Sequence, residues 1–175
     1  MGNMFAGVAQ AKTSERGAFC NPGLYKVEIK RALLKHTRKG YDAFIVEVGI
    51  LESNYNEAKK DAIQALGDKP FTMQELDKTL PNKSGSTASW FQSLADKDIG
   101  YGSLLGFMAS IMGQKADNED FRKEVEKMLE AAVNEGLLDG WVCPLEVVEI
   151  KTKRGTPFSL YKWGTTLNGL GAATP

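Results

Sequence analysis

Residues 24–50 read LYKVEIKRALLKHTRKGYDAFIVEVGI, and this stretch decides the fold class. From Tyr25 to Ile29, apolar side chains alternate with charged ones, which is the two-residue period of a strand with one buried face. After the polar segment 36–40, residues 43–50 are mostly apolar and rich in β-branched side chains, as in a second strand. The stretch therefore predicts a long β-hairpin.

A second hairpin is expected near the other end of the sequence. Residues 141–151 and 156–163 both have the composition of strands, and the four residues TKRG at 152–155 separate them. A further strand is expected over residues 87–94, where SWF interrupts a polar segment. The sequence thus predicts a mainly β protein with some α-helix.

Two helices are expected before the last hairpin, at about 101–135. The first is apolar and ends at Gly113, a common helix stop. The second begins with acidic residues at 117–120 and keeps its apolar side chains on one face. Because residues 115–139 hold eight acids and four bases, a net charge of −4, we expect this helix on the side away from any nucleic acid.

The length of the chain, 175 residues, suits one compact domain. We expect that domain over 23–163, with an insertion at about 53–84 that includes a short helix. Residues 1–22 are expected to be a flexible N-terminal arm, and 164–175 a flexible C-terminal tail rich in Gly, Ala and Thr.

Composition excludes several classes of function. The 22 basic residues equal the 22 acidic ones, so any site for a polyanion is local. Two distant cysteines and a single histidine are too few for a dedicated metal site, and neither a phosphate-binding loop nor a catalytic triad is recognisable. We therefore expect no enzyme, no cofactor and no metal. The absence of a signal peptide or a long apolar run predicts a reduced, cytoplasmic protein without a membrane span.

The two hairpin tips, TRKG at 37–40 and TKRG at 152–155, are the candidate binding elements. A Gly supplies the positive φ that a tight hairpin needs, while the adjacent Arg and Lys project into solvent. Basic tips can also serve solubility and edge protection alone. In a five-stranded Greek-key barrel of the oligonucleotide-binding (OB) type, however, the loops after strands one and four flank one binding face. The order of the predicted strands would bring both tips to that face.

Residues 24–44 contain six Lys or Arg and two acids, which predicts a basic stripe beside the first tip. A cationic groove with aromatic rings for base stacking is the usual way to hold single-stranded nucleic acid. Trp90 and Phe91 are adjacent in one strand, so one of the two rings is expected at the surface. The predicted binding residues are Lys26, Lys30, Lys35, Arg38, Lys39, Tyr41, Trp90, Lys153, Arg154, Phe158 and Tyr161.

Four runs, GLYKVEI at 23–29, TRKGYDAFIVE at 37–47, STASW at 86–90 and VVEIKTKRGTPF at 147–158, resemble the OB-fold single-stranded-DNA-binding proteins of tailed bacteriophages. The resemblance covers most of residues 23–163. It implies a five-stranded OB-type Greek-key barrel with an inserted segment and two helices before the last hairpin. It also implies a non-catalytic protein that coats transient single strands during replication and recombination in the cytoplasm of an infected bacterium.

Partners implied by the resemblance are single-stranded DNA and proteins of replication or recombination. Further copies of the chain are a separate candidate partner. Many proteins of this kind end in an acidic tail that recruits partners, but this sequence has no acid after Glu149. The alternative function is a non-catalytic, oligomerising protein-binding or virion-associated module. In that case the helix at 101–112 and the N-terminal arm would form the interface, and the basic tips would be incidental.

Overall fold

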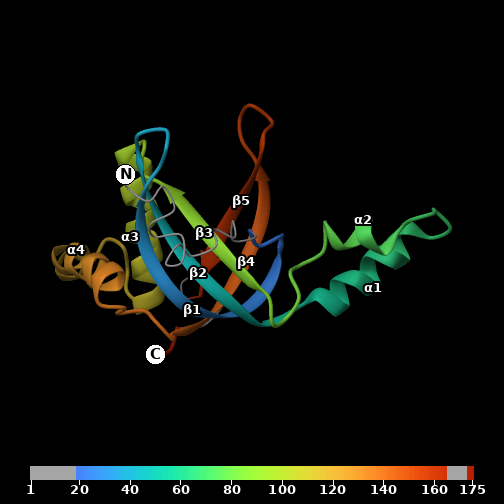
Figure 1. Cartoon of the computed structure of the whole chain (residues 1–175), viewed down its shortest axis with the longest axis horizontal. Helices are drawn as coiled ribbons and strands as arrows, with labels where there is room; N and C mark the ends of the chain where they lie inside the picture. Colours follow the sequence, from blue (N-terminus) through green and yellow to red (C-terminus); the bar gives the residue numbers. More distant parts are fainter. Residues whose placement is uncertain (1–18, 165–172) are drawn as a thin grey trace, which may run out of the picture.

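The computed structural model describes residues 19–164 and 173–175, and over these residues the chain is mainly β with α. Within these residues the chain forms a five-stranded antiparallel sheet and four helices (Figure 1). The strands are β1 (Gly23–His36), β2 (Asp42–Ser53), β3 (Thr87–Ser93), β4 (Val142–Lys151) and β5 (Pro157–Trp163). The helices are α1 (Tyr55–Leu66), α2 (Met73–Asp77), α3 (Lys97–Met112) and α4 (Glu119–Asn134).

Strand β1 lies at the centre of the sheet, whose order is β3-β2-β1-β4-β5. From Tyr25 to His36 it pairs with β2, and its first part, from Gly23 to Glu28, also pairs with β4. The register against β2 shifts between Lys26 and Val27 and again between Ile29 and Arg31. Such bulges bend a strand and increase its twist, and β1 is strongly curved in Figure 1.

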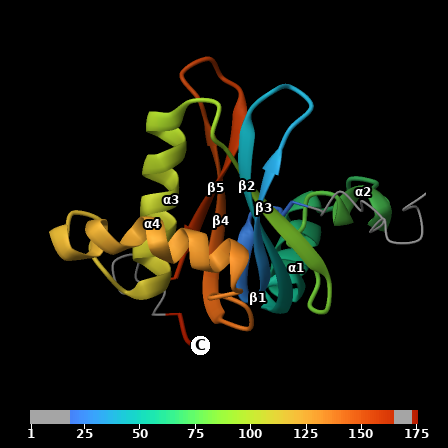
Figure 2. The same ribbon diagram turned by 60° about the vertical axis from the view of Figure 1, so that its left-hand side comes forward.

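The bend in β1 gives the sheet two arms. The first arm holds the second half of β1 with β2 and β3, and the second arm holds β4 and β5 (Figure 1). In a flat sheet the tips of the two hairpins would lie at opposite ends, because β1 and β4 are antiparallel. The bend instead brings both tips to one side of the molecule, as the two views in Figure 1 and Figure 2 show.

The core lies between the two arms and under α3. The alternation predicted for β1 is confirmed, since Tyr25, Val27 and Ile29 are all buried. Aromatic rings fill the space between the edge strands: Trp90 of β3 lies 5.7 Å from Trp163 of β5, and Phe107 of α3 lies 5.0 Å from each of them, between ring centroids. Side chains therefore join the two edge strands.

The sheet is open, so the five-stranded OB-type Greek-key barrel that the sequence predicts is confirmed only as a five-stranded antiparallel sheet. Strands β3 and β5 are its two edges, and the strand pairs described for residues 19–164 do not include a ladder between them. The rings of Trp90, Phe107 and Trp163 contact one another between these two edges. At this seam, the contact between β3 and β5, the two edge strands meet through side chains.

The predicted insertion at 53–84 is a projecting unit that contains α1 and α2 and extends away from the sheet (Figure 1). Neither helix has a fully buried residue. Polar contacts hold the unit together: the hydroxyl of Tyr55 lies 2.5 Å from Oδ1 of Asp77, and Lys83 Nζ lies 3.3 Å from Asp77 Oδ2 and 4.9 Å from the centroid of the Tyr55 ring.

Most of the two predicted flexible ends, residues 1–18 and 165–172, lies outside the described residues. The parts of these ends that are described contact the domain. Cys20 is buried, and the Asn21 side chain donates a hydrogen bond to the Leu80 carbonyl at 2.7 Å. Near the C-terminal end, Thr174 exchanges two backbone hydrogen bonds with Val142, of 2.7 and 2.8 Å. None of the helices described is long and apolar enough to span a bilayer.

The contrast between Trp90 and Phe91 provides a test of this packing. Trp90→Ala is expected to lower the free energy of unfolding by about 3–5 kcal/mol, because it leaves a cavity at the seam. Phe91→Ala, on the opposite face of the same strand, is expected to cost less than about 1 kcal/mol. Urea unfolding followed by far-UV circular dichroism measures both values. Equal costs for the two variants would contradict the described register of β3.

Candidate nucleic-acid interface

The two hairpin tips have the same backbone structure. In the first tip, Thr37 N–H donates to the Tyr41 carbonyl at 2.8 Å and Gly40 N–H donates to the Thr37 carbonyl at 3.0 Å. In the second tip, the equivalent bonds from Thr152 to Thr156 and from Gly155 to Thr152 are 2.9 and 2.8 Å. The glycines have φ of 84° and 78°, so the positive φ that the sequence predicts at both tips is confirmed.

This turn places a pair of cations at the end of each hairpin. Arg38 and Lys39 in the first tip and Lys153 and Arg154 in the second are exposed. None of the ion pairs described for residues 19–164 and 173–175 involves these four side chains. Both tips lie on one side of the molecule (Figure 1), so these four exposed cations belong to the same side.

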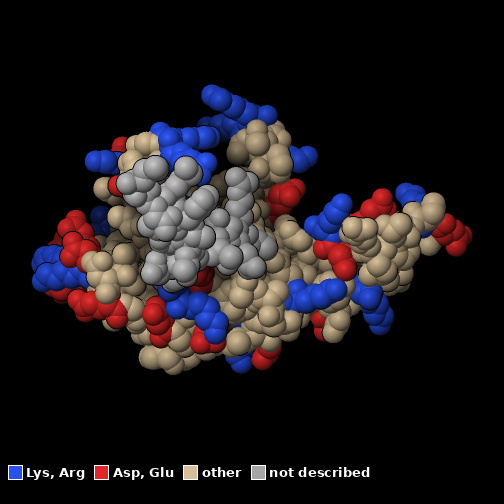
Figure 3. Space-filling model, in the orientation of Figure 1, with Lys and Arg blue, Asp and Glu red and all other residues tan. Residues whose placement is uncertain are grey.

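Two further cations lie next to the tips without an ion pair among the described residues. Lys35, a predicted site residue, is exposed near the end of β1. Lys151, which the sequence prediction did not include, is exposed at the end of β4. Figure 3 shows Lys and Arg side chains gathered along the upper edge, whereas basic and acidic side chains are mixed over the lower parts of the molecule.

The basic stripe predicted along β1 is wrong, because acidic side chains interrupt it. Lys26 Nζ lies 3.3 Å from Glu52, and Lys30 Nζ lies 2.7 Å from Glu28. The Arg31 guanidinium makes two hydrogen bonds to Glu47. Glu47 and Glu52 belong to the neighbouring strand β2, so a count of charges along residues 24–44 misses them. Predicted site residues Lys26 and Lys30 are exposed, but their charges are already paired.

The structure corrects the predicted roles of Trp90 and Tyr161. Trp90 is only 9% exposed, so its ring is not available for stacking on a base. Tyr161 is half-buried, and its ring packs 6.3 Å from the Trp163 ring. Its hydroxyl accepts a hydrogen bond of 3.0 Å from the backbone N–H of Cys20. Both side chains point inward from the edge strands β3 and β5, and there they pack against other rings of the core.

The ring that the β3 strand presents to solvent is that of Phe91, with 38% of its surface exposed. Phe91 pairs with Ile45 of β2, which in turn pairs with Leu33 of β1, so these residues form a row across the outer face of the first arm. The adjacency of Trp90 and Phe91 indicated that one ring would be exposed. Without the register of β3, the sequence could not tell which.

The remaining predicted aromatic residues lie near the tips. Tyr41 is half-buried at the base of the first tip, where its carbonyl closes the turn. Phe158, three residues after Gly155, is 52% exposed and pairs with Ile150 on the outer face of the second arm. Each arm therefore combines an unpaired pair of cations with an exposed ring, Phe91 on the first and Phe158 on the second.

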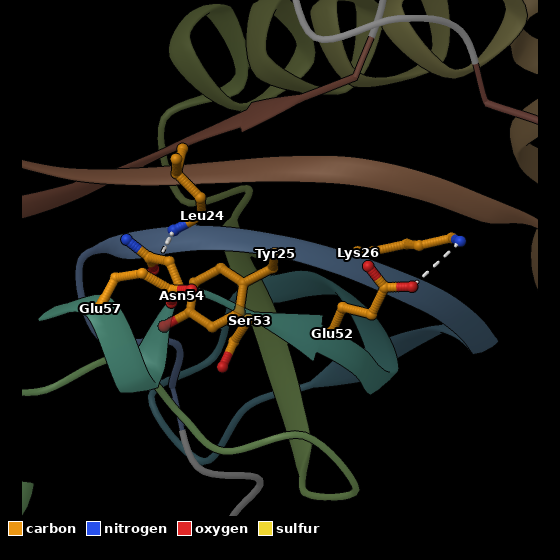
Figure 4. A pocket seen from close by; sticks show the side chains of 7 residues that line it. All are labelled: Leu24, Tyr25, Lys26, Glu52, Ser53, Asn54 and Glu57. Carbon is orange, nitrogen blue, oxygen red and sulfur yellow. Dashed lines mark hydrogen bonds and ion pairs between the residues drawn. The ribbon is translucent and has the colours of Figure 1, made fainter. Parts of the chain in front are cut away.

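A separate pocket of about 310 Å³ lies where the start of β1 meets the end of β2 and the start of α1 (Figure 4). Its polar groups already bind one another: Asn54 Oδ1 accepts from the Leu24 N–H at 2.9 Å, and Lys26 pairs with Glu52. Within the described part of the chain, His, Cys, Asp and Glu side chains do not cluster in a group that could hold a metal ion.

Neither a known protein family nor a curated protein matches the sequence. The resemblance to phage single-stranded-DNA-binding proteins therefore stays a prediction.

Burial around Tyr161 has a consequence for stability at high pH. Burial raises the pKa of Cys20 from its ordinary value of 9.0 to about 12 and that of Tyr25 from 10.0 to about 12. It also raises the pKa of Tyr161, and that of Cys143 to about 12. Above about pH 9 to 10, these groups stay protonated in the folded protein but lose their protons in the unfolded chain. Their contribution to the free energy of unfolding is therefore fully present below about pH 9, and it is lost as the pH rises toward about 12.

Cys143→Ala removes one of these buried groups and should make stability less sensitive to pH. Between about pH 9 and 11, the variant is expected to lose roughly 1 kcal/mol less per pH unit than the parent. Urea unfolding at several pH values measures the two slopes, and the difference between them cancels the titration of exposed groups. Identical slopes would show that the Cys143 thiol ionises equally in both states.

Proposed function

We propose that the protein binds single-stranded DNA and coats transient single strands in replication and recombination, without catalysis. The observation that carries the proposal is the pair of tips, Arg38-Lys39 and Lys153-Arg154, which project on one side of the sheet without an ion pair among the described residues. Cations that lack an internal partner can bind phosphate without first breaking an ion pair. Such contacts supply most of the sequence-independent affinity for nucleic acid.

The location of the other charges agrees with this proposal. Cations along β1 are neutralised by Glu28, Glu47 and Glu52, and the acidic helix α4 lies away from the tips in both Figure 1 and Figure 2. Attraction for a phosphate backbone is therefore concentrated at one end of a molecule whose net charge is zero.

An OB-type barrel is part of the proposal, and the strand order supports it. In a sheet of this order, strands two and three lie on one side of strand one and strands four and five on the other, so a barrel closes where strands three and five meet. Here the order is β3-β2-β1-β4-β5, and the rings of Trp90 and Trp163 bring the two edge strands together. Partly open barrels are common in this class, and their ligands bind near the loops that correspond to the two tips.

Salt dependence provides the main test. Single-strand affinity is expected to fall with a log–log slope of about −0.7 for each neutralised phosphate. Changing Arg38, Lys39, Lys153 and Arg154 to Ala should flatten this slope by roughly two to three. Fluorescence anisotropy with a labelled oligothymidine at several salt concentrations measures the slope.

A matched control removes the same charge elsewhere. Lys69, Lys78, Lys123 and Lys127 are exposed and lie outside the tips, and changing all four to Ala should leave the slope nearly unchanged. Equal flattening by both variants would mean that overall charge, and not the tips, decides affinity. If the parent does not bind oligothymidine at low salt, the proposed function is wrong. Equal affinity for a matched duplex would indicate a general binder of polyanions.

Base stacking is a separate contribution that Phe91 can supply. Phe91→Ala should weaken single-strand binding by about tenfold, since each stacked base contributes about 1–3 kcal/mol, and it should leave the salt slope unchanged. Phe71 in the projecting unit has the same exposed fraction, 38%, and Phe71→Ala is the matched control. The same anisotropy titration compares the two variants. A similar loss of affinity in both would show that the effect does not come from a ring on the outer face of β3.

A further inference from the structure

A second candidate surface is the groove between helices α3 and α4. Its volume is about 550 Å³, and the two helices cross in the foreground of Figure 2. Four apolar side chains line it, two from each helix: Leu104, Leu105, Val125 and Leu129. The groove is therefore an apolar surface that the described chain leaves open.

Two carboxylates, those of Glu126 and Glu130, also line the groove. They lie four residues apart on α4, so they are neighbours on one face of the helix and repel each other. Other acids of α4 have partners: Asp120 pairs with Lys123, and Glu124 pairs with Lys127. Among the described residues, neither Glu126 nor Glu130 takes part in an ion pair.

The only cation that lines the groove within the described residues is Arg122. Its Nε donates a hydrogen bond of 2.7 Å to the Ala116 carbonyl, on the loop that precedes α4. The groove therefore keeps an excess of negative charge beside an apolar floor. A complementary surface would present apolar side chains flanked by more than one cation.

The β4–β5 hairpin has this composition. On its outer face Ile150 pairs with Phe158, and Leu160 pairs with Val148. Ile150, Phe158 and Leu160 are 43%, 52% and 39% exposed. The cations of the same hairpin, Lys151, Lys153 and Arg154, are exposed and without ion pairs among the described residues.

The other hairpin fits the groove less well. Among the large apolar side chains near the first tip, Leu34 is strongly exposed, at 53%, but it lies on the inner face of its arm opposite Phe44. The outer face of that arm carries the ion-paired side chains of Arg31 and Glu47. On the outer face of the first arm Phe91 is exposed at 38%, whereas the second arm combines three exposed apolar side chains with three cations that have no ion pair among the described residues.

We propose that the β4–β5 hairpin of one copy of the chain docks into the α3–α4 groove of another copy. Phe158 and Ile150 would lie on the apolar floor, and Lys151 and Lys153 would pair with Glu126 and Glu130. In Figure 1, helices α3 and α4 lie at the left of the sheet and the tip of the β4–β5 hairpin lies at its upper right, so one copy can donate its hairpin and accept another. Contacts of this head-to-tail kind extend into open chains unless the rotation between copies closes a ring.

This inference concerns the protein without nucleic acid and does not depend on the proposed function. A docked hairpin cannot present Lys153 and Arg154 to a phosphate backbone at the same time. The test therefore contains no nucleic acid, and its outcome is independent of the oligonucleotide titrations.

Sedimentation velocity of the full chain over a range of protein concentrations provides the test. At low salt, the weight-average mass should rise continuously with concentration, and high salt should reduce it because the charge pairs are screened. Glu126→Lys together with Glu130→Lys should weaken self-association by roughly tenfold or more, because like charges across an interface repel. Lys151→Glu together with Lys153→Glu should have the same effect.

Combining the two pairs of substitutions in one chain exchanges the charges of groove and hairpin. This four-site variant should regain self-association, and so should a mixture of the two double variants. Glu119→Lys together with Glu124→Lys makes the same charge change on α4 outside the groove and should leave association at the parental level. Phe158→Ser, at an exposed position, should weaken association without changing far-UV circular dichroism.

Two outcomes would overturn the proposal. One is a parent chain that stays monomeric at low salt and high concentration. The other is association that persists at parental strength in the Glu126→Lys, Glu130→Lys variant while its circular dichroism matches the parent. Restored association in the four-site variant would support the pairing of these two surfaces specifically, because a general effect of charge cannot produce it.

Discussion

The antiparallel pairing of β1 with two partners at once is the constraint on which the other features depend. One strand has to offer hydrogen bonds to β2 along its length and to β4 along its first part, while it curves from one arm into the other. The register shifts at Lys26 and Ile29 make this curvature compatible with pairing. As a result, two hairpins distant in sequence end on the same side, and their inward faces share one aromatic core.

Local patterns were sufficient to predict the elements themselves. The alternation in β1, the glycines of the two tips and the apolar spacing of α3 and α4 each depend on a few neighbouring residues, and the structure confirms them. The roles of Trp90 and Phe91 depend on which face of β3 turns inward, and that is decided by its pairing with β2. Strand pairing also brings Glu47 and Glu52 to the cations of β1, which no count along one segment can reveal.

The candidate site could be predicted in part for the same reason. Tip residues project beyond the last ladder pair, so their exposure does not depend on register, and the sequence alone identifies them. Tyr161 and Trp90 sit within strands, where a shift of one residue exchanges buried and exposed positions. Sequence patterns also could not predict that the sheet is open. Closure depends on how closely the edges of β3 and β5 approach when the rings of Trp90, Phe107 and Trp163 pack between them.

A seam joined by rings has a consequence for the motion of the domain. In the described chain, no ladder joins the edge strands β3 and β5, whereas β1 is paired with β2 and, over its first part, also with β4. If the two arms move apart, the rings between β3 and β5 slide past one another. No hydrogen bonds of a ladder between these two described strands have to break. The angle between the arms, and with it the spacing of the two basic tips, is thus a softer coordinate than the geometry within either hairpin. The two hairpins are thus rigid units joined by the bent strand β1, and the distance between their tips can change while each hairpin keeps its own structure.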